Sequence, residues 1–353
     1  MQEIIFIDEG SFPPTPEGVT REWVQGAAEN RDEDEKLFSI IREAFQIKID
    51  AGVQVPTYPP QFRDMIGQFF DIIKDEKNCH EPYVLKEERA TILELEAIDE
   101  VAKQYKIETG KTLEVRVCIA GPTDMYYQAF GATAFVDVYD ILAKDIEKFI
   151  KQAFKTAKNF KIKVIALDEI GLGLNDKIQF SDDEIISALT VASTFARQQG
   201  GADVEIHVYS PLKYELICET PPINVIGFEY AGNPSYIDLL DRKVLEDSDA
   251  YAGGVGISRT DIFSLISIVN EKYGINAWKD KEYMQKIVTE LETPDIIKKR
   301  LETAYSVLGG DRIKYANPDC GLAFWPDQEL AFRLLENTAK AVNEFNAEGI
   351  INK

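Results

Sequence analysis

Short apolar runs alternate with longer amphipathic stretches along this chain. Each run is rich in β-branched residues and ends in Gly, Pro, Asn or Asp, and the segment after it carries apolar residues at helical spacing. This alternation predicts parallel strands that are connected by helices. The predicted strands span residues 4–7, 53–56, 115–120, 163–167, 204–208, 224–228, 251–256 and 313–316.

Eight such units are the number that closes a (β/α)8 barrel, the TIM barrel. The clearest helical stripes span residues 36–49, 86–106, 137–157 and 182–197. The segment 276–309 is longer than one barrel helix requires, so we expect extra helices before the last strand. A doubly wound sheet is the alternative, but the first strand leads into Gly10-Ser11-Phe12-Pro13 and not into a glycine-rich turn that opens a helix. We therefore predict an α/β protein with one catalytic barrel domain, residues 1–353.

The charge balance excludes some classes of partner. The chain has 39 basic and 61 acidic residues among 353, a formal charge of -22, which repels phosphate backbones and anionic lipids. Four scattered cysteines are not a disulfide framework, and no signal peptide or long apolar span is evident. We expect a cytoplasmic protein that binds neither nucleic acid nor membrane. The adjacent Cys79 and His80 are expected in an exposed loop.

Reactive side chains collect where the predicted strands end, which is where barrel enzymes carry their active sites. Asp168 and Glu169 follow the fourth strand, His207 lies in the fifth, Glu229 follows the sixth and Cys320 follows the eighth. A histidine, a carboxylate and a cysteine suit Zn²⁺ better than Mg²⁺ or Ca²⁺. Their spacing matches no local zinc pattern, and a lone strand histidine is more often simply packed. From spacing alone, both interpretations of His207, as a zinc ligand and as a packed side chain, stay open.

At these residues the chain resembles the cobalamin-independent methionine synthase family. Gly10-Ser11-Phe12-Pro13 is similar to that family's first substrate loop, and Gly121-Pro122-Thr123 and Leu167-Asp168-Glu169 match two of its turns. The most specific match is Asn317-Pro318-Asp319-Cys320-Gly321-Leu322, which resembles the signature around the family's last zinc ligand. The matches cover the family's C-terminal barrel only. They are similar to the short core form of archaea and anaerobic bacteria, which is thought to take methyl groups from a corrinoid and not directly from a folate.

The resemblance implies a role for each matching residue. His207, Glu229 and Cys320 would bind zinc, and Asp168 would contact the amine of homocysteine, with Glu169 beside it as a second catalytic carboxylate. Gly10 and Ser11 would bind the substrate carboxylate. The implied reaction is zinc-dependent transfer of a methyl group to the homocysteine thiol to form methionine, with a methylated corrinoid or corrinoid protein as donor. Asp319 or Glu169 is a candidate partner for the second nitrogen of His207.

Two departures from the family pattern leave alternatives open. Tyr209 stands where the family has a further cysteine ligand, two residues after His207, and the seventh-strand loop, 254–261, lacks the family's histidine. The metal could keep an open position, Tyr209 or water could fill it, or metal binding could be weaker. The rival functions are a zinc alkyltransferase for another thiol such as coenzyme M, and a non-catalytic barrel. A related decarboxylase is disfavoured because few arginines stand at strand ends.

Overall fold

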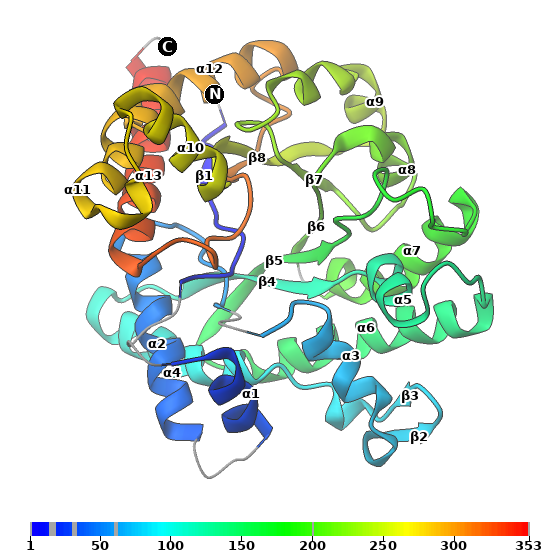
Figure 1. The fold of residues 1–353 in the computed structure, drawn as a ribbon. Coiled ribbons are helices and arrows are strands. Elements are labelled where there is room, and N and C mark those ends of the chain that lie inside the picture. The colour runs from blue at the N-terminus through cyan, green and yellow to red at the C-terminus, as the bar shows by residue number, and fades with distance from the viewer. Residues whose placement is uncertain (1, 14–18, 30–33, 60–62, 200, 352–353) are drawn as a thin grey trace.

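The computed structural model describes residues 2–13, 19–29, 34–59, 63–199 and 201–351. Seven parallel strands form one sheet in the order β1-β9-β8-β7-β6-β5-β4, and the sheet curls at the centre of the molecule (Figure 1). These strands are β1 (Ile5–Phe6), β4 (Leu113–Ala120), β5 (Phe160–Asp168), β6 (Asp203–Val208), β7 (Val225–Phe228), β8 (Tyr251–Ser258) and β9 (Tyr315–Pro318). Seven of the eight predicted strands are therefore confirmed.

The remaining predicted strand, 53–56, lies between the two edge strands without forming a strand of its own. Val55 makes an isolated parallel bridge to Ile7, beside β1 at one edge of the sheet. Thr57 makes another to Arg116 of β4, the strand at the other edge. The Arg116 N–H also donates to the Pro56 carbonyl at 3.1 Å. Proline removes a ladder donor, which accounts for bridges in place of a continuous strand. The structure thus has a curled parallel sheet of seven strands, a coarser result than the predicted eight-stranded barrel.

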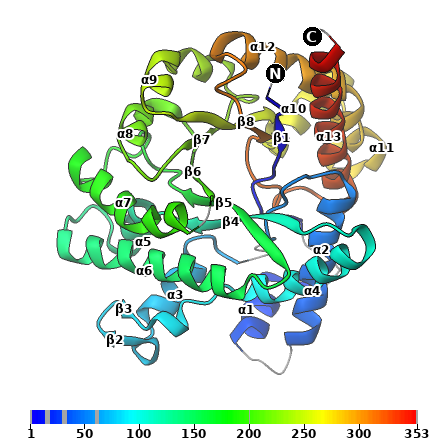
Figure 2. The same ribbon diagram turned by 180° about the vertical axis from the view of Figure 1, so that it is seen from behind.

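Helices surround the strands, as Figures 1 and 2 show from opposite sides. The α-helices are α1 (Arg21–Glu29), α2 (Asp34–Asp50), α3 (Gly67–Lys74), α4 (Leu93–Thr109), α5 (Pro122–Phe130), α6 (Val136–Thr156), α7 (Asp182–Gln198), α8 (Tyr214–Cys218), α9 (Arg242–Asp247), α10 (Ile262–Tyr273), α11 (Lys281–Met284), α12 (Pro294–Leu308) and α13 (Gln328–Ile351). The four predicted helices correspond to α2, α4, α6 and α7. Helix α4 begins later than predicted, because only a short 3-10 turn, Glu87–Arg89, precedes it.

Two local features correct or refine the sequence prediction. The segment 276–309 contains the short helix α11 and the longer helix α12, as the extra length predicted. A π-helical turn, Ile287–Leu291, separates the two helices. Cys79 is not in an exposed loop: it begins a small hairpin of β2 (Cys79–Glu81) and β3 (Val84–Leu85), and its buried thiol donates to the Ile73 carbonyl. Among the described helices, none has the length and apolar character needed to cross a membrane.

Inside the sheet, a small apolar floor is separate from the larger core between strands and helices. The side chains of the floor are Ile7, Val55, Val164, Val225 and Tyr315. Side chains of a strand alternate between its faces, so residues two positions further along the same strands stand above this floor. Those residues include Glu9, Thr57 and Asn317. The fold therefore places polar groups above the apolar floor, toward the carboxyl ends of the strands.

Candidate functional site

Strand β6 supplies the centre of the candidate site. Its period of two puts Asp203, Glu205 and His207 on the inner face, while the intervening valines and isoleucine face the helices. Parallel pairing in register sets His207 beside Asp168 of β5. Two of the predicted site residues are therefore neighbours on adjacent strands.

A buried ionic layer lies just above the apolar floor. The Arg116 guanidinium donates from Nε to Glu205 at 2.7 Å and from Nη2 to Glu9 at 2.6 Å. Asn317 donates from its side-chain amide to the other oxygen of Glu9. All four side chains are buried, and they come from β4, β6, β9 and the segment after β1. The layer fixes these segments to one another directly beneath His207.

His207 is buried, at 3% exposed, and neither ring nitrogen makes a hydrogen bond with any residue that the structure describes. Its Nδ1 lies 3.4 Å from a Glu9 carboxylate oxygen. Burial, with help from the Arg116 charge, lowers the pKa of His207 to about 4, so the imidazole is neutral near pH 7. A neutral ring keeps one lone pair free to bind a metal.

Cys320 and Glu229 lie half-buried in the loops after β9 and β7. Burial, together with the Glu229 and Glu9 carboxylates, raises the pKa of the Cys320 thiol to about 12. Burial and the Asp261 charge raise the pKa of Glu229 to about 7. The Glu229 carboxylate therefore lies close enough to Cys320 to favour the neutral thiol. A bound cation would reverse that preference, and a histidine, a carboxylate and a thiol are donor types that suit Zn²⁺. Among the described residues, however, His207, Glu229 and Cys320 do not form a group whose ligand atoms all lie within 4.8 Å of one another.

Tyr209 occupies the region where the expected fourth ligand is missing. Its hydroxyl lies 3.9 Å from the Cys320 sulfur, and the ring stands edge-on to His207 with 6.2 Å between ring centres. The pKa of the Tyr209 hydroxyl is raised, first by the Cys320 charge and then by burial. The phenol therefore stays protonated and lies close to two of the predicted ligands, His207 and Cys320.

Asp168 and Glu169 face opposite sides of their strand. The Asp168 carboxylate is half-buried and accepts no hydrogen bond from the described residues. Burial, against a lowering effect of Arg116, raises its pKa well above the ordinary range. The buried Glu169 carboxylate instead accepts the backbone N–H groups of Thr123 and Asp124, at 2.9 Å each, at the start of α5. Glu169 thus holds a helix terminus, and its carboxylate does not face the same side as Asp168.

Gly10 and Ser11 connect the first loop to the last. Gly10 has a φ of +108°, which glycine adopts without strain. Its N–H donates to Asp8 at 3.0 Å, and its carbonyl accepts from the buried Lys48 ammonium. The Ser11 carbonyl accepts from the Leu322 N–H at 2.8 Å, so this loop is fixed beside the segment that carries Cys320.

Asp319 does not contact His207, which corrects one sequence expectation. Its two oxygens accept the backbone N–H groups of Tyr230, Ala231 and Gly232, at 2.7 to 2.9 Å. Glu169 does not contact the His207 ring either, since both its oxygens are used at α5. The carboxylates that do approach the ring are those of Glu9 and Glu205.

Sequence reasoning missed Glu9, Arg116 and Glu205. One ligand-type atom from each of Glu9, Glu205 and His207 lies within 4.8 Å of the others, and this buried group could hold a cation. The available signal was the position of Arg116 and Glu205 inside apolar strands, at the alternating positions that face inward. A charge at such a position must find a partner, because burying it alone is costly.

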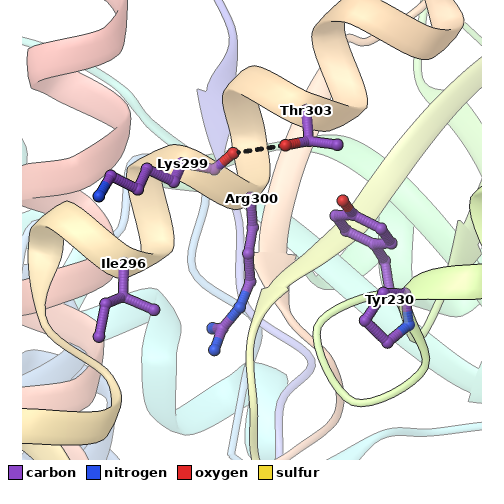
Figure 3. Close-up of a pocket in the computed structure, with 6 residues that line it drawn as sticks. Tyr230, Ile296, Lys299, Arg300 and Thr303 are labelled. Carbon is purple, nitrogen blue, oxygen red and sulfur yellow. Dashed lines mark hydrogen bonds between the residues drawn. The ribbon is translucent and has the colours of Figure 1, made fainter.

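A separate cavity of about 280 Å³ lies outside this site, between the loop after β7 and helix α12 (Figure 3). Its lining residues are Tyr230, Pro234, Ile296, Lys299, Arg300 and Thr303. The Thr303 hydroxyl donates to the Lys299 carbonyl at 2.9 Å within the helix. None of the predicted catalytic or metal residues lines this cavity, so it is not part of the candidate site.

Comparison with known proteins agrees with this description. No protein-family model matches the chain. The chain is 29% identical over 146 residues to the methionine synthase of Methanothermobacter marburgensis, a match that covers 40% of this chain and 37% of that relative. A solved B12-independent methionine synthase of a Shewanella species, in complex with selenomethionine, aligns over 98% of both chains with 14% identity and a TM-score of 0.62. A methyltransferase from Methanosarcina mazei aligns over 98% of this chain and 95% of its own, with 10% identity and a TM-score of 0.59.

The fold is an α/β fold whose curled parallel sheet is similar to that of the TIM-barrel methionine synthases. The resemblance expected from the motifs is confirmed: the chain is similar to the cobalamin-independent methionine synthases. The names of these relatives agree with the expected methyltransferase class.

Proposed function

We propose that the chain is a zinc-dependent methyltransferase that forms methionine from homocysteine, with a methylated corrinoid as the methyl donor. The proposal treats residues 1–353 as one cytoplasmic (β/α)8 barrel domain, with the segment 53–57 in the place of the second strand. His207, Glu229 and Cys320 would hold the zinc, Asp168 and Ser11 would bind the substrate, and Gly10 would shape the loop that carries Ser11.

The observation that carries the proposal is the unpartnered His207 ring. Both nitrogens are buried without a hydrogen bond, a costly arrangement unless a bound group completes it. The Cys320 thiol and the Glu229 carboxylate, in the loops after β9 and β7, are the remaining donor types of a catalytic zinc site. The charges fit as well: one carboxylate and one thiolate, with a neutral imidazole, balance the two charges of Zn²⁺.

The zinc would supply a positive centre on which a substrate thiol is held as a thiolate near pH 7. The residues of this chain would bind and orient the rest of homocysteine. The Asp168 carboxylate has no internal hydrogen-bond donor, so it is free to accept one from the substrate ammonium. Because the Gly10 N–H already donates to Asp8, the donors left for the substrate carboxylate are those of Ser11. Tyr209 stays protonated beside Cys320.

The test is the zinc content of the purified protein and of His207→Ala, Glu229→Gln and Cys320→Ala variants. We expect about one zinc per chain in the unaltered protein and a loss in each variant. His80→Ala and Cys218→Ala are matched controls, because they change the only other histidine and a half-buried free thiol. Protein prepared with zinc that retains none would favour the non-catalytic barrel, for which the replacement by Tyr209 is the main argument.

A further inference from the structure

Two carboxylates lie at one edge of the His207 ring. A Glu9 oxygen is 3.4 Å from Nδ1, and the ligand-type atoms of Glu9, Glu205 and His207 lie within 4.8 Å of one another. A Cβ atom built on Gly227 would lie 2.3 Å from the Glu205 Oε1 atom and 3.5 Å from Nδ1. Both atoms therefore lie over the same glycine, which leaves them room to face each other.

These carboxylates are held rigidly by the buried ionic layer. Arg116 donates to one oxygen of each, and Asn317 donates to the second oxygen of Glu9. The second oxygen of Glu205, Oε1, is buried and has no hydrogen-bond partner among the described residues. Glu205 and His207 therefore both have unused hydrogen-bonding capacity at the same place.

The chemistry of a neutral imidazole decides which ring nitrogen of His207 carries the proton. Such a ring has one N–H and one lone pair, and carboxylates only accept hydrogen bonds. The N–H thus belongs on Nδ1, facing the carboxylates, and the lone pair belongs on Nε2. A dication among the three groups is less suited, because it would lie beside the Arg116 guanidinium and use the lone pair that the zinc site needs.

We propose that Glu9 and Glu205 are positioning residues for His207. They accept the Nδ1 proton, fix the tautomer and ring orientation, and so leave the Nε2 lone pair for the metal. The purpose of this arrangement rests on the proposed zinc site, but the tautomer itself can be measured without any metal.

The first experiment is nitrogen-15 NMR of the imidazole rings in metal-free protein. The chain has only two histidines, so a His80→Asn variant assigns both rings. We expect the His207 proton on Nδ1 and an unprotonated Nε2. In a Glu9→Gln, Glu205→Gln double variant, the fraction of this tautomer should fall. A proton on Nε2 in the unaltered protein would overturn the proposal, whatever the protein's activity.

The second experiment is zinc affinity, measured by competition with a chelator. We expect Glu9→Gln and Glu205→Gln each to weaken zinc binding by about 10- to 100-fold, the usual effect of such partners. Glu94→Gln is the matched control: Glu94 is also buried, pairs with an arginine and has one unpartnered oxygen, and we expect unchanged affinity. Thermal melting of each variant checks that it folds.

The outcomes separate this proposal from the proposed function. Unchanged affinity in both glutamine variants, with zinc lost in Cys320→Ala, would overturn the positioning role and leave the zinc site standing. Metal that survives Cys320→Ala but is lost in Glu205→Gln would make the carboxylates ligands themselves and would also overturn it. If the unaltered protein binds no zinc, the proposed function fails, and the NMR result still decides the tautomer.

Discussion

Buried carboxylates in this protein are tolerated because each has a defined partner. Glu9 and Glu205 share Arg116, whereas Glu169 accepts two backbone N–H groups at the start of α5. Burial and the neighbouring Asp124 raise the pKa of Glu169 to about 8, far above its ordinary value of 4.5. Burial raises the pKa of all three carboxylates despite these partners, so each makes stability depend on pH in the same direction.

The first prediction concerns Glu169. Because its folded pKa is raised, the folded state holds the proton more tightly than the unfolded chain does. This stabilisation is complete below about pH 4.5 and is lost as pH rises through about 8. The free energy of unfolding should fall between these limits by at most about 1.4 kcal/mol per pH unit. Urea unfolding at several pH values should show a shallower slope for Glu169→Gln. An unchanged slope would contradict this, and Glu184→Gln, at an exposed capping box, is the control.

Some site residues could be predicted from sequence and others could not. His207, Glu229 and Cys320 are reactive types at strand ends, and that position alone drew attention to them. The sequence does show Glu9 after a predicted strand and Arg116 inside one, but their contact joins residues 107 positions apart, and no local pattern reveals it. The local pattern also could not distinguish Asp168 from Glu169, because only the exact strand register decides which of two neighbours faces inward.

At the scale of elements, the loop after β7 is fixed to the loop after β9. Asp319 accepts three consecutive N–H groups, 230–232, next to Glu229. A Cβ on Gly256 would lie 2.1 Å from an Asp319 oxygen, so glycine is required there for the close approach. Asp319 therefore determines where two of the predicted ligands, Glu229 and Cys320, stand relative to each other.

The second prediction is that Asp319→Asn destabilises the protein and loosens this loop. The new amide group would face an N–H donor, so the free energy of unfolding should fall by roughly 1–3 kcal/mol. Hydrogen exchange at residues 230–232 should become faster. Asp327→Asn, which changes the carboxylate that accepts from Leu330 at the start of α13, should leave exchange at 230–232 unchanged. Equal protection of the loop in both variants would contradict the role given to Asp319.

The strands were easier to predict than their exact pairing. Apolar, β-branched runs located β4 to β9 correctly, because burial on both faces leaves a clear local pattern. The run 53–56 has the same pattern, yet Pro56 keeps it from pairing continuously. The hairpin of β2 and β3 was missed, since strands of two or three residues are too short to show a period.

For the whole molecule, the first strand and the last helix are joined directly. The buried Asn346 side chain accepts from the Ile4 N–H at 3.1 Å and donates to the Ile4 carbonyl at 2.8 Å. Helix α13 packs against both β1 and β9. The sheet edge that carries Glu9 therefore depends on residues more than 300 positions away.

The third prediction tests this closure. Asn346→Ala leaves both Ile4 backbone groups buried without partners, so the free energy of unfolding should fall by roughly 1–3 kcal/mol. Asn343→Ala, at an exposed position of the same helix, should change it by less than about 0.5 kcal/mol. Chemical denaturation of both variants measures the difference. Equal stabilities would mean that the helix packing alone holds the first strand.

The central claim is that this barrel-type protein methylates a thiol held on zinc. The most direct measurement mixes zinc-loaded protein with homocysteine and methylcobalamin carrying a labelled methyl group, and detects labelled methionine by mass spectrometry. We predict methionine formation, slowed about 10- to 100-fold in Asp168→Asn, because the charged partner of the substrate ammonium is removed. Zinc-loaded protein that forms no methionine would contradict the claim.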